Sequence, residues 1–115
     1  MRSRVLIVDD SRPMREFIRM TLGDAVEIVG ECEDGSDALD AYTRLQPDWV
    51  LMDVDMKRMD GIAATKQIIA AHPNAQIMIV THHTDFKLRR AAQDAGAKRY
   101  VLKEDLHFIP DILSE

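Results

Sequence analysis

The sequence predicts an α/β fold in which five parallel strands alternate with helices that cover both faces of the sheet. Three runs of four residues are purely apolar: Val5–Val8, Trp49–Met52 and Ile77–Val80. Runs without in-out alternation are typical of strands that are buried on both faces, as in a parallel sheet. Two less apolar stretches, Val26–Cys32 and Arg99–Leu102, predict further strands nearer the edges. Because right-handed crossovers place helices on both faces, the predicted sheet is doubly wound.

Four helical patterns lie between these strands. The residues that can open them are, in order, Ser11, Gly35 with Ser36, Asp60 and Thr84. The side chains predicted to face inward are Met14, Phe17, Ile18 and Leu22; Leu39, Tyr42 and Leu45; Ile62, Thr65, Ile68 and Ile69; and Leu88, Ala91, Ala92 and Ala95. Gly96 is the expected C-terminal stop of the fourth helix. In the last segment, Pro110 permits only a short helix or a bend.

Length and charge limit the classes of function. A chain of 115 residues suits one compact domain, and its formal net charge of −5 argues against non-specific binding to nucleic acid or anionic membranes. We see no apolar run of membrane-spanning length and no signal-peptide pattern, which favours a cytoplasmic protein. The single cysteine, Cys32, lies in an apolar run and is interpreted as a small buried hydrophobe rather than a reactive thiol.

Polar side chains follow four of the predicted strands. Asp9 and Asp10 follow the first strand, Asp53 follows the third, and Thr81 and Lys103 follow the fourth and fifth. In an open α/β sheet, ligands bind outside the carboxyl ends of the strands. Because neighbouring strands lie only about 5 Å apart, side chains from adjacent strand ends are expected to converge on one small site.

The residue types at this edge favour phosphoryl chemistry on a carboxylate. Three carboxylates in one place repel each other unless a cation lies between them, and hard oxygen ligands suit Mg²⁺ or Mn²⁺. Lys103 supplies a positive charge and Thr81 a hydroxyl donor for an anionic group. Phosphoryl transfer depends chiefly on such positioning and neutralisation. An acyl phosphate on Asp53 is therefore the expected product.

Four motifs, VLIVDDS, VLMDVDMKRMDG, IMIVT and RYVLKEDL, resemble the response-regulator receiver family of two-component signalling in order and spacing across nearly the whole chain. The resemblance implies a flavodoxin-like strand order 2-1-3-4-5 and a single receiver domain over residues 1–115. The motif YVLKEDL is most similar to receivers that precede a helix-turn-helix output domain. We therefore expect either a stand-alone receiver or one excised from a longer transcription regulator.

The resemblance also implies a role for each site residue. Asp53 is the implied phosphoacceptor, Asp10 a direct metal ligand, and Asp9 a metal partner that acts partly through water. Asp55 is implied to bind the metal through its backbone carbonyl. Thr81 and Lys103 are implied to contact the phosphoryl group, and Tyr100 together with Thr81 forms the implied rotameric switch. The implied phosphoryl donor is a histidine kinase or phosphotransfer protein. The implied activity is that of a switch that phosphorylates and dephosphorylates itself, rather than that of a turnover enzyme.

Phosphorylation is expected to repack the face formed by the fourth helix, the fifth strand and the fifth helix. On or near this face lies a basic cluster of Lys87, Arg89, Arg90, Lys98 and Arg99. One interpretation is an ordinary solvated surface. The other is a binding surface for an acidic partner or for a second copy of the domain, which would give a homodimer on phosphorylation.

Several positions depart from the family pattern. Lys57 and Arg58 occupy a loop where the family commonly has proline, His82 follows the threonine where a small residue is usual, and Glu104 replaces a frequent proline after the lysine. We expect a trans peptide bond before Glu104, since the cis form costs about 3–4 kcal/mol when no proline follows.

Asp55 and His83 are the two residues expected to tune the lifetime of the phosphorylated state. In the family, the positions two beyond the phosphoacceptor and two beyond the threonine flank the path of the attacking water, and here both are ionisable. Lys57 is a competing partner for Asp55, and simple solvent exposure of all three is the alternative. Because histidine titrates near neutral pH, we hypothesise that hydrolysis depends on pH between about 5.5 and 7.5.

Three other interpretations remain open at this point. Asp53 and Asp55 also resemble the nucleophile motif of haloacid-dehalogenase-type phosphatases, although that family places its acidic metal pair after the nucleophile. A flavin- or nucleotide-binding module of the same fold would offer glycines or hydroxyls in the first turn, where this chain has two aspartates. A metal site at His82 and His83 is disfavoured, because adjacent strand residues point in opposite directions.

Overall fold

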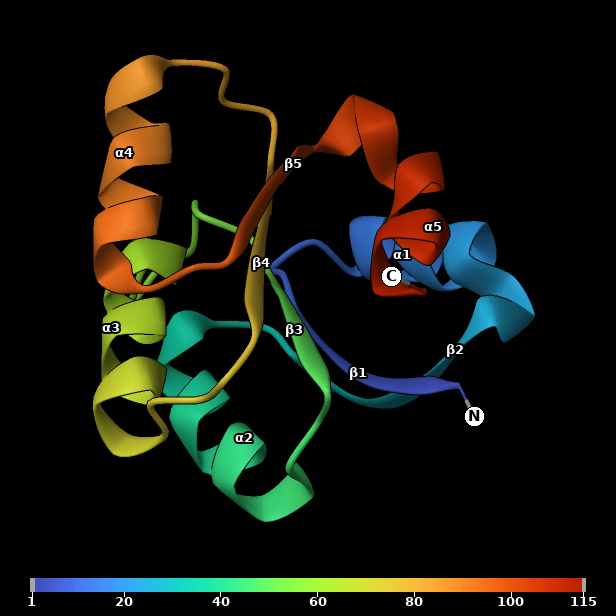
Figure 1. Cartoon of the computed structure of the whole chain (residues 1–115), viewed down its shortest axis with the longest axis horizontal. Coiled ribbons are helices and arrows are strands. Elements are labelled where there is room, and N and C mark those ends of the chain that lie inside the picture. The colour runs from blue at the N-terminus through green and yellow to red at the C-terminus, as the bar shows by residue number, and fades with distance from the viewer. Residues whose placement is uncertain (1, 115) are drawn as a thin grey trace.

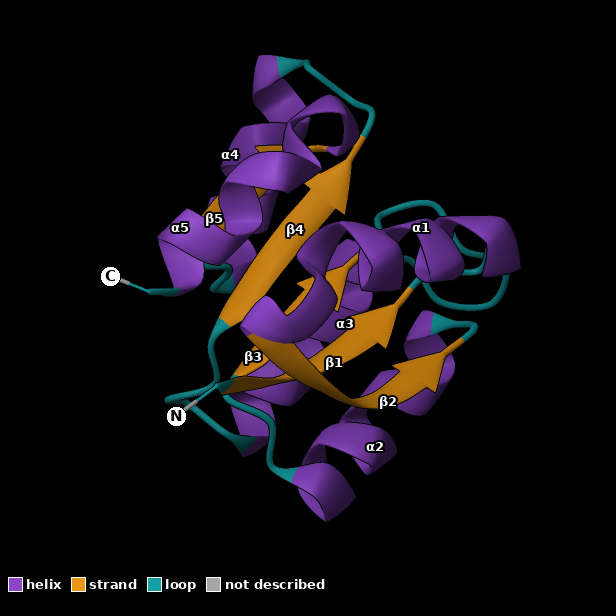
Figure 2. Ribbon diagram, turned by 90° about the vertical axis from the view of Figure 1, so that its right-hand side faces the viewer, coloured by secondary structure: helices purple, strands orange, loops and turns teal. Residues whose placement is uncertain are grey.

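Five parallel strands form one sheet in the order β2-β1-β3-β4-β5 (Figure 1). The computed structural model describes residues 2–114. The strands are β1 (Ser3–Val8), β2 (Val26–Cys32), β3 (Trp49–Met52), β4 (Ile77–Thr81) and β5 (Arg99–Leu102). The arrowheads of β1, β2 and β4 point toward the same edge of the sheet (Figure 2). The predicted fold class, strand positions and strand order are confirmed.

Helices cover both faces of this sheet. They are α1 (Arg12–Leu22), α2 (Ala38–Leu45), α3 (Gly61–Ala71), α4 (Phe86–Ala95) and α5 (Ile109–Leu113). Figure 1 shows α2, α3 and α4 on one side of the strands and α1 and α5 on the other. Within residues 2–114, we find no helix that is both long and apolar enough to cross a membrane.

The strand side chains alternate between two hydrophobic cores. In β4, Ile77 and Ile79 pack into the core beneath α2, α3 and α4, whereas Met78 and Val80 pack into the core beneath α1 and the C-terminal segment. Both faces of the central strands are therefore buried, because each face has its own layer of helices. This arrangement explains why the central strands read as continuous apolar runs.

Two details of the helices differ from the prediction. Asp85, rather than Thr84, caps α4 by accepting a hydrogen bond from the N–H of Leu88 at 3.1 Å. Phe17 was predicted to face inward, but it is 48% exposed, while Ile18 and Leu22 are buried. The apolar face of α1 is thus narrower than the periodicity indicates, because it must cover only one strip of the sheet.

The C-terminal segment contains both a short helix and a bend, the two alternatives that the sequence predicted around Pro110. A 3₁₀ helix spans Lys103–Phe108, with a break in helical geometry at Asp105, and α5 follows with Pro110 in its first turn. The peptide bond between Lys103 and Glu104 is trans, as predicted. Gly96 ends α4 in the left-handed conformation, with φ of +109°, which confirms it as the C-terminal stop.

Candidate functional site

The carboxylates of Asp9, Asp10 and Asp53 meet at the carboxyl edge of the sheet. One oxygen from each lies within 4.8 Å of the others, and Asp9 and Asp53 are buried while Asp10 is exposed. The strands β1 and β3 are hydrogen-bonded neighbours, so their ends lie side by side. The Asp53 N–H also donates to the carbonyl of Val8 at 2.8 Å. Parallel strand pairing therefore assembles the predicted acidic cluster.

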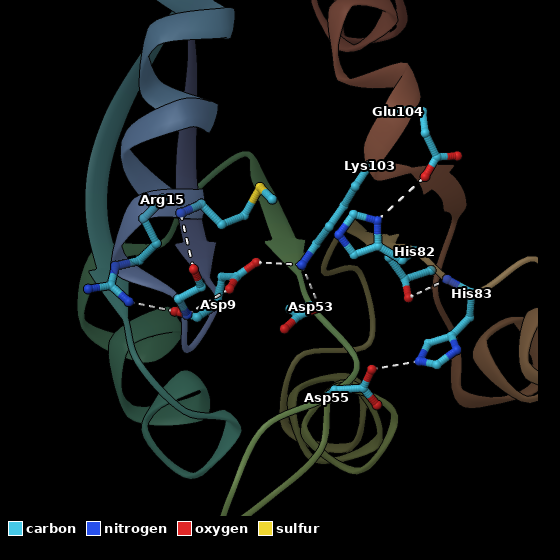
Figure 3. A network of polar contacts seen from close by, with 11 residues as sticks. Asp9, Arg15, Asp53, Asp55, His82, His83, Lys103 and Glu104 are labelled. Atoms are coloured by element: carbon cyan, nitrogen blue, oxygen red, sulfur yellow. Dashed lines mark hydrogen bonds and ion pairs between the residues drawn. The ribbon is translucent and has the colours of Figure 1, made fainter.

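Lys103 points from the end of β5 between two of these carboxylates (Figure 3). Its Nζ lies 3.1 Å from Asp9 Oδ2 and 3.1 Å from Asp53 Oδ1. Burial by itself would lower the pKa of Lys103, but the charges of Asp53 and Asp9 outweigh it and raise the pKa. The ammonium group is therefore held charged beside the expected phosphoacceptor.

The carboxylate of Asp53 is poorly stabilised in spite of this ion pair. Burial, together with the nearby charge of Asp9, raises its pKa from the ordinary value of 3.8 to about 6, although Lys103 acts in the opposite direction. A buried acid whose charge lacks full compensation is a frequent feature of functional sites. The structure thus contains a carboxylate that a second cation would stabilise.

The oxygen donors at this edge fit a divalent metal ion. Asp10 and Asp53 offer hard carboxylate oxygens, and the exposure of Asp10 leaves room for water in the coordination shell. Mg²⁺ is typically held by one or two carboxylates together with several waters. The residues therefore match the predicted Mg²⁺ or Mn²⁺ site, with Asp9 already occupied by the Lys103 ion pair.

Arg15, on α1, supports the site through hydrogen bonds and was not predicted as a site residue. Its Nη1 donates to the backbone carbonyl of Asp9 at 2.6 Å, and its Nε donates to Glu31 Oε1 at 2.8 Å. Ser11, which caps α1 as predicted, donates its N–H to Asp9 Oδ1 at 2.9 Å. The sequence analysis assigned Arg15 no role at the site. Arg15 precedes Ile18 by three residues and therefore lies on the same face of α1. This spacing is the sequence signal that could have identified Arg15 as buried.

Thr81 and Tyr100 are both tied to the backbone of His83. The Thr81 Oγ1 accepts from the His83 N–H at 3.1 Å, and the Tyr100 hydroxyl donates to the His83 carbonyl at 2.8 Å. Arg89 of α4 stacks on the Tyr100 ring, with its guanidinium carbon 4.6 Å from the ring centroid. The two predicted switch residues lie on different strands, but they have a hydrogen-bond partner in common, the backbone of His83.

Two histidine–carboxylate pairs connect the loop after β4 to its neighbours (Figure 3). His83 Nε2 lies 2.6 Å from Asp55 Oδ2, and His82 Nδ1 lies 3.5 Å from Glu104 Oε1. The adjacent histidines thus have different partners. The pairing of His82 with Glu104 was not predicted, although both had been noted as departures from the family pattern.

Outside the site, Cys32 behaves as the sequence indicated. Its thiol is buried, and burial raises the pKa to about 11, so the reactive thiolate is disfavoured at neutral pH. Arg89 and Arg90 of the basic cluster have side-chain partners. Arg89 contacts Tyr100, and Arg90 forms an exposed 4.0 Å ion pair with Asp94 one helical turn away.

Comparisons with known proteins agree with this geometry. Residues 5–109 match the response regulator receiver domain family. The chain is 39% identical over 108 residues to the chemotaxis protein CheY of Thermotoga maritima, covering 90% of this chain and 87% of CheY. It is 38% identical over 103 residues to the uncharacterized transcriptional regulatory protein YhcZ of Bacillus subtilis, covering 88% of this chain but only 48% of YhcZ.

A solved structure shows the same likeness in three dimensions. The chain superposes on a LuxR-family two-component response regulator from Aurantimonas sp. SI85-9A1 with a TM-score of 0.91 and 31% sequence identity, covering 99% of this chain and 86% of that one. The fold, the acidic cluster and the family match point to one conclusion. The chain belongs to the response regulator receiver family, and it is a phosphoacceptor signalling domain.

Proposed function

We propose that Asp53 accepts a phosphoryl group, in a reaction that depends on Mg²⁺ or Mn²⁺, from a histidine kinase or phosphotransfer protein. The observation that carries this proposal is the position of Asp53 between the Lys103 ammonium and the carboxylates of Asp9 and Asp10. A carboxylate oxygen of Asp53 attacks the phosphorus atom, a P–O bond forms, and the P–N bond to the donor histidine breaks. The bonding electron pair leaves with the imidazole nitrogen of the donor, and an acyl phosphate remains on Asp53.

Each neighbour of Asp53 has a distinct part in this proposal. A divalent cation held by Asp10, Asp53 and the Asp55 carbonyl would neutralise the charge on the phosphoryl oxygens. Lys103 would move its contact from Asp53 to a phosphoryl oxygen, while its bond to Asp9 keeps the ammonium group in place. A haloacid-dehalogenase mechanism is not favoured, because the Asp55 carboxylate that would act as its acid/base is bonded to His83 instead.

Intact-mass analysis tests the phosphoacceptor directly. Treatment with a small phosphodonor and Mg²⁺ should add one phosphoryl group to the parent protein. Asp53→Asn should show no adduct, because the amide is not a nucleophile for this reaction. The Asp55→Asn protein is a matched control and should still be modified, since its side chain lies outside the carboxylate cluster. An adduct of equal amount in Asp53→Asn would assign the phosphoacceptor elsewhere.

The switch in this proposal runs through the backbone of His83. A phosphoryl oxygen on Asp53 would draw the Thr81 hydroxyl toward it and weaken the bond that Thr81 accepts from the His83 N–H. The Tyr100 hydroxyl is bonded to the carbonyl of the same residue, so the loop and the Tyr100 ring would move together. Because Arg89 stacks on that ring, the movement would reach α4 and the basic surface.

We further propose that this surface binds an acidic partner, or a second copy of the domain, when Asp53 is phosphorylated. Light scattering on the phosphodonor-treated samples, with and without the acidic partner under test, would detect either assembly. An unchanged mass in every phosphorylated sample would remove this face as the output.

A cytoplasmic location and a transcription-regulating output in the whole protein also belong to the proposal. The 48% coverage of YhcZ is compatible with a further domain, and the 87% coverage of CheY with a lone receiver.

We also propose that His83 and Asp55 set the lifetime of the acyl phosphate. The 2.6 Å contact between them places an imidazole two residues beyond Thr81 and a carboxylate two residues beyond Asp53. The phosphorylated His83→Gln protein should lose phosphate at least about threefold more slowly than the parent at pH 7.5, because glutamine cannot accept a proton from the attacking water. The decay should also lose its dependence on pH between about 5.5 and 7.5.

The matched control for this experiment is His82→Gln. His82 is the adjacent histidine, but it pairs with Glu104 rather than with Asp55. Its substitution should leave the decay rate within about twofold of the parent, as expected for an exposed pair away from the reacting atoms. Equal decay of the parent and His83→Gln across the pH range would exclude His83 from the hydrolysis.

A further inference from the structure

Asp34 joins two loops that are far apart in the sequence. It lies in the turn between β2 and α2, and it is only 8% exposed. Its carboxylate accepts one local hydrogen bond from the N–H of Ser36 at 2.9 Å. It also accepts bonds from the N–H groups of Arg58 at 2.9 Å and Met59 at 3.1 Å, which belong to the loop between β3 and α3. A buried carboxylate thus fixes the backbone of that loop.

The neighbouring glycine shows that the two loops are also closely packed. A Cβ atom added to Gly35 would lie 2.4 Å from the carbonyl oxygen of Met59 and 3.1 Å from that of Asp60. Only a residue without a side chain permits this approach. The β3–α3 loop is therefore held against the β2–α2 turn by hydrogen bonds and by direct packing.

This loop connects the phosphoacceptor to α3. It leaves β3 at Asp53, passes Asp55, and reaches Arg58 and Met59 before α3 begins. His83 holds the side chain of Asp55, whereas Asp34 holds the backbone a few residues further on. Asp34 also lines the same hollow as Asp10, so the anchored part of the loop lies beside the acidic cluster.

We propose that Asp34 is a positioning residue for the metal site, which holds the β3–α3 loop so that the backbone carbonyl of Asp55 is in place for the divalent cation. This inference rests on the proposed function. Asp34 acts through the loop and does not touch the cation. Partners that orient a metal ligand in this way typically change metal affinity by 10–100-fold when they are replaced.

The chemistry of the carboxylate explains why aspartate is needed at this position. Its two oxygens accept three N–H bonds, with Oδ1 serving Arg58 and Oδ2 serving Ser36 and Met59. An asparagine has one acceptor oxygen, and its NH₂ group would face an N–H donor. Asp34→Asn should therefore break a hydrogen bond to the backbone of the β3–α3 loop while keeping the volume of the side chain.

The test compares Mg²⁺ binding with phosphorylation at saturating Mg²⁺. Calorimetric titration with Mg²⁺ alone should give a dissociation constant about tenfold higher for Asp34→Asn than for the parent. The rate of modification by a small phosphodonor should fall at low Mg²⁺ but stay within about twofold of the parent at saturation, because bound metal restores the position of the carbonyl. A simple loss of stability would lower the rate at every Mg²⁺ concentration.

The matched control is Asp48→Asn. Asp48 also accepts a backbone N–H bond from a distant residue, Arg4, at 2.7 Å, but it lies at the opposite end of the sheet from the acidic cluster. Its Mg²⁺ constant should not change. If Asp34→Asn fails to fold, Gly35→Ala carries the test, because the added methyl group pushes on the Met59 carbonyl while Asp34 remains.

The outcomes separate this inference from the proposed function. A parent protein that is modified normally, together with Asp34→Asn or Gly35→Ala proteins whose Mg²⁺ constants stay within twofold, overturns the positioning role alone. A uniform drop in rate at all Mg²⁺ concentrations also overturns it. A parent protein that neither binds Mg²⁺ nor accepts a phosphoryl group overturns both.

Discussion

In the presence of a chelator at pH 7.5, the Asp53→Asn protein should be more stable than the parent by about 1–3 kcal/mol. Burial and the charge of Asp9 raise the pKa of Asp53 to about 6, above its ordinary value of 3.8. The folded chain therefore binds this proton more tightly than the unfolded chain does. The ionised Asp53 carboxylate destabilises the metal-free fold above pH 6, and this cost disappears as the pH falls from 6 toward 4. Asparagine keeps the shape of the side chain and removes the charge.

Urea denaturation of both proteins between pH 4.5 and 7.5 measures this difference. The advantage of Asp53→Asn should shrink steadily as the pH is lowered, and saturating Mg²⁺ should reduce or reverse it, because the cation binds the native carboxylate. The exposed Asp24 provides a control, since Asp24→Asn removes an equal charge outside the site. A metal-free Asp53→Asn protein that is less stable than the parent at pH 7.5 would show that Lys103 compensates the buried charge more fully than the geometry indicates.

Gly61→Ala should cost about 3 kcal/mol or more of folding free energy, at the upper end of the range for overpacking. A Cβ atom at Gly61 would lie 1.9 Å from the carbonyl oxygen of Asp53 and 2.8 Å from its carbonyl carbon. Both are backbone atoms, so no flexible side chain can move aside. The Gly61 N–H also donates to the Val54 carbonyl at 2.9 Å, which prevents the start of α3 from retreating without losing that bond.

The same substitution should slow modification of Asp53 at least about tenfold under conditions in which the protein is still folded, because displacement of reacting groups by about 1 Å has effects of this size. Denaturation curves and intact-mass time courses on the same preparation measure both effects. The control is Gly23→Ala, where a Cβ would meet nothing within 4 Å and the cost, about 1–3 kcal/mol, comes only from the backbone conformation at φ 52° and ψ −136°. Parent-like stability and modification rate in Gly61→Ala would contradict the close approach.

The sequence predicts those features of the molecule that depend on local pattern or on the geometry of a parallel sheet. Apolar runs locate the strands, because both faces of the central strands are covered. The convergence of Asp9, Asp53 and Lys103 follows from the order of the strands, since each residue stands directly after a strand end. The choice of Asp85 over Thr84 as a cap was missed, because either residue can accept the same bond.

The residues that brace the site were not found in the sequence, because their partners are distant along the chain. Arg15 bonds to Glu31, sixteen positions away, and Asp34 bonds to the backbone at Arg58, twenty-four positions away. The turn containing Asp34 and Gly35 was interpreted only as the opening of a helix. An aspartate before a glycine suits many turns, so its second contact becomes visible only once the strands are placed in space.

The ion pairs of Lys103 have a consequence for the electrical balance of the site. Three carboxylates and one ammonium group give three negative charges against one positive charge, which leaves a formal charge of minus two. Arg15 and the neighbouring Arg19 do not alter this balance, because their two charges are matched by Glu31 and Glu33. One divalent cation brings the total to zero, whereas a monovalent cation does not. Phosphorylation then adds further negative charge at Asp53. The cation and the phosphoryl group therefore reinforce each other, and by linkage each is bound more tightly when the other is present.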